Sequence, residues 1–124
     1  MMPVPSEVME ILDSYARELD KLSGDLAGVE RSLEPVEVAY EAFLDDFEVG
    51  CWERHTGDEE AKLPSAEMRL RLARKAMDTE LLGRYASLTA SRKRIEKRIS
   101  ALGKAVSAQQ SILSALKIEL ESIR

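Results

Sequence analysis

The chain has 124 residues, enough for one domain, and 44% of them are hydrophobic whereas only 5% are aromatic. Charged residues make up 33% of the chain and leave a formal net charge of −5, but they alternate with apolar residues at helical spacing, which excludes a disordered chain. No apolar run reaches the roughly 18 residues that a membrane-spanning helix requires. We therefore expect a soluble, cytoplasmic and nearly all-helical protein.

A first helix is predicted over residues 6–48, because apolar residues recur there in alternating steps of four and three. A period of 3.5 residues keeps these positions facing a partner helix and favours a left-handed supercoil. Ser6 is the expected N-cap, and Glu7 and Glu10 follow in the first turn, where the helix dipole favours acidic side chains. We call the apolar positions the first seam: Val8, Leu12, Tyr15, Leu19, Leu22, Leu26, Val29, Leu33, Val36, Tyr40, Phe43 and Phe47.

Pro35 lies inside this predicted helix. An interior proline removes a backbone hydrogen bond and clashes with the preceding turn, at a cost of about 3 kcal/mol. We expect a kink or a short break near Pro35 that keeps both segments on the same seam, because the spacing continues in phase. Gly24 and Gly28 weaken the helix by about 1 kcal/mol each, and they would also allow a partner helix to approach closely.

Residues 49–64 lose the period and contain Gly50 and Pro64, which predicts a loop between two helices. Ser65 is then the expected N-cap of a second helix over residues 65–124. The steps of four and three return in that helix after two consecutive steps of four, which mark a stutter that locally unwinds a supercoil. We call its regular positions the second seam: Leu81, Tyr85, Leu88, Arg92, Ile95, Ile99, Leu102, Val106, Gln109, Leu113, Leu116, Leu120 and Ile123.

The two predicted helices form a long antiparallel hairpin of the coiled-coil type. At 1.5 Å per residue the first would be about 60 Å long and the second about 90 Å, so the first would end opposite Ala105. Apolar seam residues beyond that point would lack a partner within the chain, and leaving each in water forfeits about 1.5 kcal/mol or more. We expect them to pack against another copy, most simply as a dimer within an oligomeric helical bundle: Val106, Leu113, Leu116, Leu120 and Ile123.

Charge is divided sharply along the chain. Residues 1–67 carry 5 basic and 18 acidic side chains, a net charge of −13, whereas residues 68–104 carry 11 basic and 3 acidic ones, a net charge of +8. An acidic first helix beside a basic second helix would be held in register by complementary charges that flank the seams. This is the interpretation that we prefer.

Direct contact with nucleic acid is the alternative interpretation of the basic residues. Five cations within residues 91–98 could neutralise phosphates and release counterions: Arg92, Lys93, Arg94, Lys97 and Arg98. No aromatic residue alternates with them to stack on bases, and the acidic net charge of the chain repels nucleic acid at long range.

The predicted loop gathers the only cysteine and the only histidine with several acidic residues: Cys51, Trp52, His55, Asp58, Glu59 and Glu60. Two ligands do not make a metal site, and a nucleophilic cysteine would need a third orienting group and an oxyanion cradle. Acidic neighbours such as Asp45 and Asp46 point apart on a helix, so they cannot act together as acid and base. We therefore predict no catalytic residue, metal or cofactor and no enzymatic activity, and we expect Trp52 to cap the open end of the hairpin.

The layout resembles a group of known proteins. An acidic heptad helix runs into Val38, Ala39, Tyr40 and Glu41, a charged connector follows, and the long second helix closes on Ser111, Ile112, Leu113, Ser114, Ala115, Leu116, Lys117 and Glu119. In these features the chain is similar to small coiled-coil proteins encoded in the early, DNA-recombination regions of tailed bacteriophages. That resemblance implies an accessory role in phage DNA recombination or replication, as an oligomer that engages a recombinase, a single-strand-binding protein or a host protein.

Three functions follow from these observations. The leading one is a non-enzymatic, self-associating interaction protein. The second is a DNA-binding accessory protein that uses the basic cluster of residues 91–98, and the third is a structural or chaperone-like coiled coil.

Overall fold

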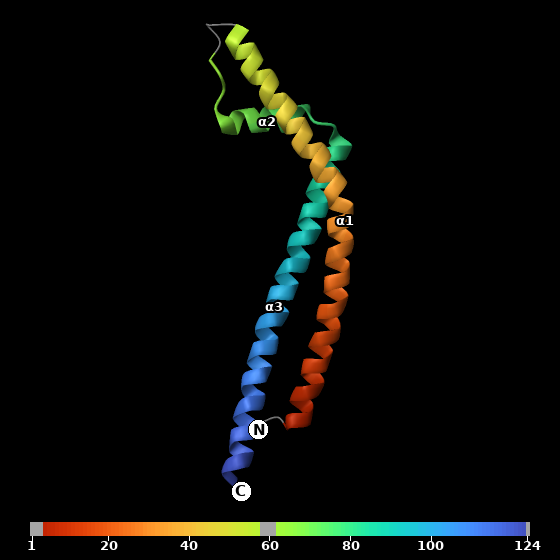
Figure 1. Ribbon diagram of the computed structural model, residues 1–124, viewed down its shortest axis with the longest axis vertical. Helices are drawn as coiled ribbons and strands as arrows, with labels where there is room; N and C mark the ends of the chain where they lie inside the picture. The colour runs from red at the N-terminus through yellow and green to blue at the C-terminus, as the bar shows by residue number, and fades with distance from the viewer. Residues whose placement is uncertain (1–3, 58–61, 124) are drawn as a thin grey trace. The chain divides into compact units, whose positions relative to one another are not determined.

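The computed structural model describes residues 4–57 and 62–123. Within these ranges the chain contains helices and no strand, which confirms the predicted all-α class. The helices are α1 (Pro5–Gly57), α2 (Ala66–Ala76) and α3 (Thr79–Ile123) (Figure 1). By length and apolarity, no helix of this described part could cross a membrane.

The chain divides into two compact units. Unit 1 combines residues 1–28 with residues 92–124, and unit 2 spans residues 29–91. The start of α1 therefore packs with the end of α3 in unit 1, whereas the rest of α1 packs with α2 and the start of α3 in unit 2.

The predicted loop over residues 49–64 is wrong over its first half, because α1 continues through Gly50 to Gly57. A glycine in a helix costs about 1 kcal/mol relative to alanine, but packing of an apolar side chain outweighs such a propensity. Cys51, which follows Gly50, is buried in this way. The predicted loop residues Asp58, Glu59 and Glu60 lie outside the described residues.

The predicted second helix is divided in two by Met77 and Asp78. Met77 has an extended backbone and a buried side chain, and its N–H donates back to the carbonyl oxygen of Ala73 at 3.0 Å. The carboxylate of Asp78 accepts a hydrogen bond from the N–H of Leu81 at 3.3 Å, which caps the start of α3. The break coincides with the two steps of four, Ala73 to Met77 to Leu81, so the stutter in the sequence marks the end of one helix and the start of the next.

The two predicted N-caps have different outcomes. The hydroxyl of Ser65 accepts a hydrogen bond from the N–H of Met68 at 3.2 Å, which confirms Ser65 as the N-cap of α2. Ser6 lies inside α1, which begins at Pro5, and the N–H of Glu7 donates instead to the carbonyl oxygen of Val4 at 3.0 Å. A proline is favourable at the first helical position because its fixed φ suits the helix and its missing N–H is not needed there.

Pro35 does not break α1, which is helical on both sides of it. The side chain of Pro35 is exposed, and the neighbouring seam residues Leu33 and Val36 are buried in unit 2. Burying two such side chains contributes about 1.5–3 kcal/mol each, which offsets the cost of about 3 kcal/mol for the proline. A Cβ atom added at Gly24 or Gly28 would meet nothing within 4 Å, so neither glycine marks a close approach of helices within the chain.

In unit 1, α1 and α3 run antiparallel, with the start of α1 beside the end of α3 (Figure 1). Their contact follows the two seams. From α1, Val8 is fully buried and five further seam residues are half-buried: Leu12, Tyr15, Leu19, Leu22 and Leu26. From α3, Leu102 and Leu116 are buried.

In unit 2, the core contains Leu33, Val36 and Tyr40 from α1, together with Ala73 and Met77. The ring of Tyr40 stacks on the ring of Tyr85 in α3, with centroids 3.8 Å apart and planes within 3° of parallel. The Nε of Arg74 in α2 donates to the hydroxyl of Tyr40 at 3.1 Å. Tyr40 therefore contacts both of the other helices and fixes where each lies against α1.

Candidate interaction surfaces

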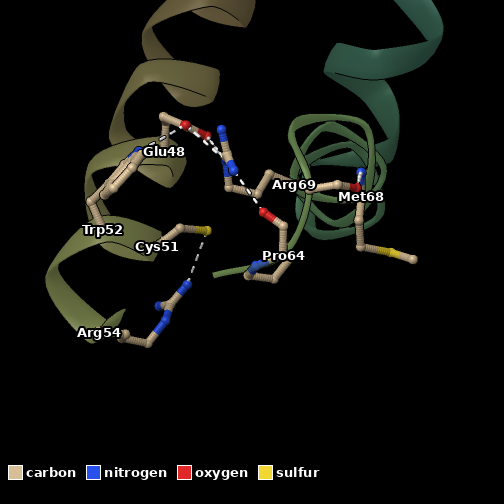
Figure 2. A network of polar contacts seen from close by, with 8 residues as sticks. Glu48, Cys51, Trp52, Arg54, Pro64, Met68 and Arg69 are labelled. Carbon is tan, nitrogen blue, oxygen red and sulfur yellow. Dashed lines mark hydrogen bonds and ion pairs between the residues drawn. The ribbon is translucent and has the colours of Figure 1, made fainter. Parts of the chain in front are cut away.

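A polar network centred on Glu48 joins α1 to α2 in unit 2 (Figure 2). The Nε of Arg69 donates to both carboxylate oxygens of Glu48, at 2.8 and 2.9 Å, and the indole N–H of Trp52 donates to one of them at 3.0 Å. An Nη of Arg69 also donates to the carbonyl oxygen of Pro64 at 2.6 Å. The network therefore attaches both the start of α2 and the segment before it to α1.

The sequence explains why these groups meet. Glu48 and Trp52 are four residues apart on α1, so they share a face of the helix, and Arg69 lies in the first turns of α2, just after its N-cap. The guanidinium of Arg69 lies 5.6 Å from the centroid of the Trp52 ring, as in a cation–π contact. Hydrogen bonds from Arg69, and then from Trp52, hold the pKa of Glu48 below its ordinary value, so this carboxylate is charged at neutral pH.

Cys51 and His55 lie one turn apart on α1. The thiol of Cys51 is buried and accepts a long contact from an Nη of Arg54 at 3.6 Å, whereas the ring of His55 meets the ring of Trp52 edge-on, with centroids 6.3 Å apart. Within the described residues, no three His, Cys, Asp or Glu side chains gather as a metal site would require. Trp52 is half-exposed beside Arg69 of α2, so it packs on the helix that follows the predicted loop.

An apolar groove lies between α1 and α2 next to this network. Its volume is about 270 Å³, and its lining combines apolar side chains with charged ones: Leu44, Asp45, Phe47, Glu48, Ala66, Arg69, Leu70 and Ala73. A groove of this size can hold one large apolar side chain but not a whole small-molecule cofactor, for which pockets of about 300–1,000 Å³ are typical.

A shallower hollow of about 530 Å³ lies at the start of α3 in unit 2. It is lined by Ser32, Thr79, Glu80, Gly83, Arg84, Ser87 and Leu88. In the part of the chain that the structure describes, no buried side-chain nitrogen or oxygen lacks a hydrogen-bond partner. The hollow therefore contains no buried polar group that requires a ligand.

The predicted nucleic-acid cluster is partly engaged within the chain. Arg98 forms an ion pair with Glu18 of α1, with 2.7 Å between Nη2 and Oε1, and Arg92 is half-buried and lies 3.9 Å from the carboxylate of Glu96. The pairing of Arg98 with an acidic residue of α1 agrees with the preferred interpretation that the charges set the register. The other three cations of the cluster are exposed on α3: Lys93, Arg94 and Lys97.

The five residues that we expected to lack an internal partner fall into two groups. Leu116 is only 7% exposed and Val106 and Leu113 are half-buried, whereas Leu120 and Ile123 are 54% and 80% exposed. The expectation is therefore wrong for the first three. The 11 residues of α2 form a separate helix, so residues beyond Ala105 lie beside the start of α1. The role of these five residues in assembly stays a prediction. The exposed ones, Leu120 and Ile123, lie at the C-terminal end of α3.

The contact between Glu48 and Arg69 was not predicted from the sequence, because the residues after Glu48 were expected to form a loop. One signal was present: Glu48 and Trp52 have the spacing of a helical pair, and Ser65 places Arg69 in the first turns of the next helix. No family model, curated protein or solved structure matches this chain.

Proposed function

We propose that this protein is a non-enzymatic helical interaction protein that self-associates through the C-terminal end of α3. The observation that carries the proposal is the exposure of the last two members of the second seam. Leu116 is buried within the chain, but Leu120 and Ile123 continue the same seam with most of their surface in water. Each would contribute about 1.5–3 kcal/mol if a second copy covered it.

The sides of unit 1 support the same proposal. Next to the two seams, Val4 lies just before α1, α1 carries Ile11, and α3 carries Ala105 and Ile112. All four are exposed or only half-buried. Apolar residues beside a seam widen the apolar stripe of a helix beyond what one partner helix covers. A second hairpin packed on this side would complete a four-helix arrangement.

The charge of this end suits contact between identical surfaces. Residues 105–124 carry two basic and two acidic side chains, so two copies meet there without net repulsion. The first 67 residues, with a net charge of −13, would repel their counterparts in a second copy. Self-association is therefore favoured at the end of α3 and opposed along most of α1.

The resemblance to small coiled-coil proteins of phage early regions supports an accessory role in DNA recombination or replication as the setting of this assembly. Direct DNA binding is the second candidate function. The exposure of Lys93, Arg94 and Lys97 favours it, whereas the ion pair of Arg98 with Glu18 competes with it.

Sedimentation equilibrium separates the two functions. The molar mass is measured over a range of protein concentrations, alone and with a short single-stranded DNA, at low and moderate salt. A dimer or larger oligomer whose mass ignores the DNA supports self-association. A monomer whose mass rises with DNA, and falls again as salt is raised, contradicts self-association and supports the DNA-binding function.

A further inference from the structure

The part of α1 in unit 2 carries a second apolar stripe that no other described helix covers. From Val38 the stripe passes through Ala42, Val49 and Trp52, all of them exposed, and the acidic residue Asp45 interrupts it between Ala42 and Val49. The five positions follow one another in steps of four and three. The stripe is distinct from the first seam, whose members Tyr40, Phe43 and Phe47 are buried or half-buried. At 1.5 Å per residue the stripe is about 21 Å long, the span of about four helical turns.

Trp52, at the end of this stripe, is half-exposed but held in position. Its N–H donates to Glu48 at 3.0 Å and its ring lies 5.6 Å from the guanidinium of Arg69. Tryptophan is the residue type most enriched among the side chains that dominate protein interfaces, and a ring that is already ordered loses little entropy on binding. The groove between α1 and α2 adjoins the stripe, because Asp45 and Glu48 line it.

Acidic side chains interrupt and border the stripe. Glu41, Asp45 and Asp46 are exposed and form no ion pair with any other described residue. Three cations of α2 are engaged, whereas Lys75, near the end of that helix, is exposed. The engaged ones are Arg69 with Glu48, Arg71 with Glu67, and Arg74 with the hydroxyl of Tyr40. The stripe is therefore an apolar surface with a negative border.

We propose that this stripe and the adjoining groove bind a basic amphipathic helix of a partner protein. The partner helix would lay its apolar face against Val38, Val49 and Trp52, insert one large apolar side chain between Phe47 and Leu70, and direct Lys or Arg side chains at the acidic border. This is recognition of a helix in a groove, with complementary charge setting orientation and association rate.

In a second copy of this chain, α3 does not have the chemistry that the stripe requires. The short helix α2 does expose Met68, Leu70 and Leu72 beside an excess of cations, so a second copy is the competing occupant that the test below distinguishes. Among the described residues of α3, the exposed large apolar side chains are Ile118, Leu120 and Ile123. They lie in the stretch whose basic and acidic residues are balanced, beyond the basic cluster of residues 91–98. No described segment of α3 therefore combines exposed large apolar residues with an excess of cations.

The test uses a synthetic helical peptide of about 16 residues, with Leu on one face and Lys elsewhere, and without Trp. Trp52 is the only tryptophan of the chain, so its emission reports on the stripe directly. We expect a saturable blue shift on binding and an affinity that falls as salt is raised. A peptide with the same Leu pattern and Glu in place of Lys is expected not to bind.

Matched variants locate the binding site, measured by the fluorescence anisotropy of a labelled peptide. Val49→Lys should weaken binding at least tenfold, because Val49 is part of the stripe. Met9→Lys should leave binding unchanged, because Met9 lies outside the stripe. The two side chains make a matched pair, since both are on α1 and are 55% and 56% exposed. Asp45→Asn with Asp46→Asn should weaken binding several-fold, and Asp20→Asn with Asp25→Asn, exposed residues in unit 1, should not. Circular dichroism checks that each variant keeps its helical content.

Any of four results would overturn the proposal. Three concern the peptide: no binding of the basic peptide at low salt, equal binding of the acidic peptide, or equal loss of affinity in the Val49 and Met9 variants. The fourth is a molar mass, measured without peptide, that is lower for Val49→Lys than for the unaltered protein, because a second copy would then be the occupant. The variant Leu120→Lys with Ile123→Lys is expected to bind the peptide normally, so this test is independent of self-association.

Discussion

Arg98 of α3 and Glu18 of α1 form an ion pair across 80 residues of sequence, with Nε and Nη2 of the arginine 2.8 and 2.7 Å from the same carboxylate oxygen. The pair lies beside the apolar seams of unit 1 and joins the acidic first part of the chain to its basic segment. Several registers would bury leucine against leucine along these seams, but few of them also place opposite charges together. The pair therefore contributes to register more than to total stability.

Reversing one charge of this pair should destabilise the protein modestly. Both side chains are partly in water, so Arg98→Glu is expected to cost about 0.2–1 kcal/mol in the free energy of unfolding, and less at high salt. Glu18→Arg combined with Arg98→Glu should recover most of that loss. Urea unfolding followed by circular dichroism measures both. If the double variant loses as much unfolding free energy as the two single variants lose together, the two side chains are not coupled.

Tyr40 should contribute strongly to the stability of unit 2, because its buried ring stacks on Tyr85. Tyr40→Ala is expected to cost about 3–5 kcal/mol, in the range for large aromatic truncations. Tyr40→Phe removes only the hydroxyl that accepts from Arg74 and should cost about 0.5–1.5 kcal/mol. Tyr15→Phe is the control, since its hydroxyl makes no hydrogen bond to another described residue and its loss should be neutral. Equal losses in the two Phe variants, measured by urea unfolding, would contradict the role of Arg74.

Gly24→Ala should stabilise the protein by about 0.5–1 kcal/mol. The glycine is exposed within α1 and an added Cβ atom would meet nothing within 4 Å, so the change lowers backbone entropy in the unfolded chain without a clash. Thermal unfolding measures the gain. Ala16→Gly, an exposed position in the same helix, should give a loss of similar size. A destabilised Gly24→Ala variant would mean that another helix approaches α1 closely at this point.

Acid should loosen the contact between α1 and α2. The pKa of Glu48 is lowered in the folded protein by hydrogen bonds from Arg69 and Trp52, so the carboxylate contributes its stability above the unfolded-state pKa of about 4.3 and loses it as pH falls through the lower, folded pKa. The emission of Trp52 should therefore change with a midpoint below about 4.3. Glu48→Gln should abolish this step, and Glu41→Gln, an exposed acid on the same helix, should not. A midpoint at or above the ordinary value in the unaltered protein would contradict the network.

The periodicity of the sequence predicted most of the helical structure. The first seam identified the side of α1 that packs inward, from Val8 to Phe47, because a 3.5-residue period admits few other structures. The stutter at Met77 was visible in the sequence, but its consequence was not. A step of four can bend a continuous helix or end it, and the choice depends on the burial of Met77 and the cap at Asp78, which are tertiary contacts.

The candidate surfaces were harder to predict. Gly50 and the charged residues after it are typical of a loop, and only the burial of Cys51 and the pairing of Glu48 with Arg69 explain why the helix continues. The sequence predicted that the last apolar residues of the second seam lack a partner within the chain, but fewer of them are exposed than it predicted. The inner ones, such as Leu116, are covered because α2 takes up chain that a simple hairpin would have paired with α1.

Self-association through the end of α3 is the central claim, and sedimentation equilibrium of two matched variants tests it most directly. Leu120→Lys with Ile123→Lys removes the exposed end of the second seam. Ile118→Lys places a lysine at an apolar, 67% exposed position two residues before Leu120 that does not belong to the seam. The unaltered protein and Ile118→Lys are expected to form the same oligomer, and the double variant is expected to be a monomer with unchanged helical content. An oligomer that persists in the double variant would contradict the proposed interface, and a monomeric unaltered protein would contradict self-association itself.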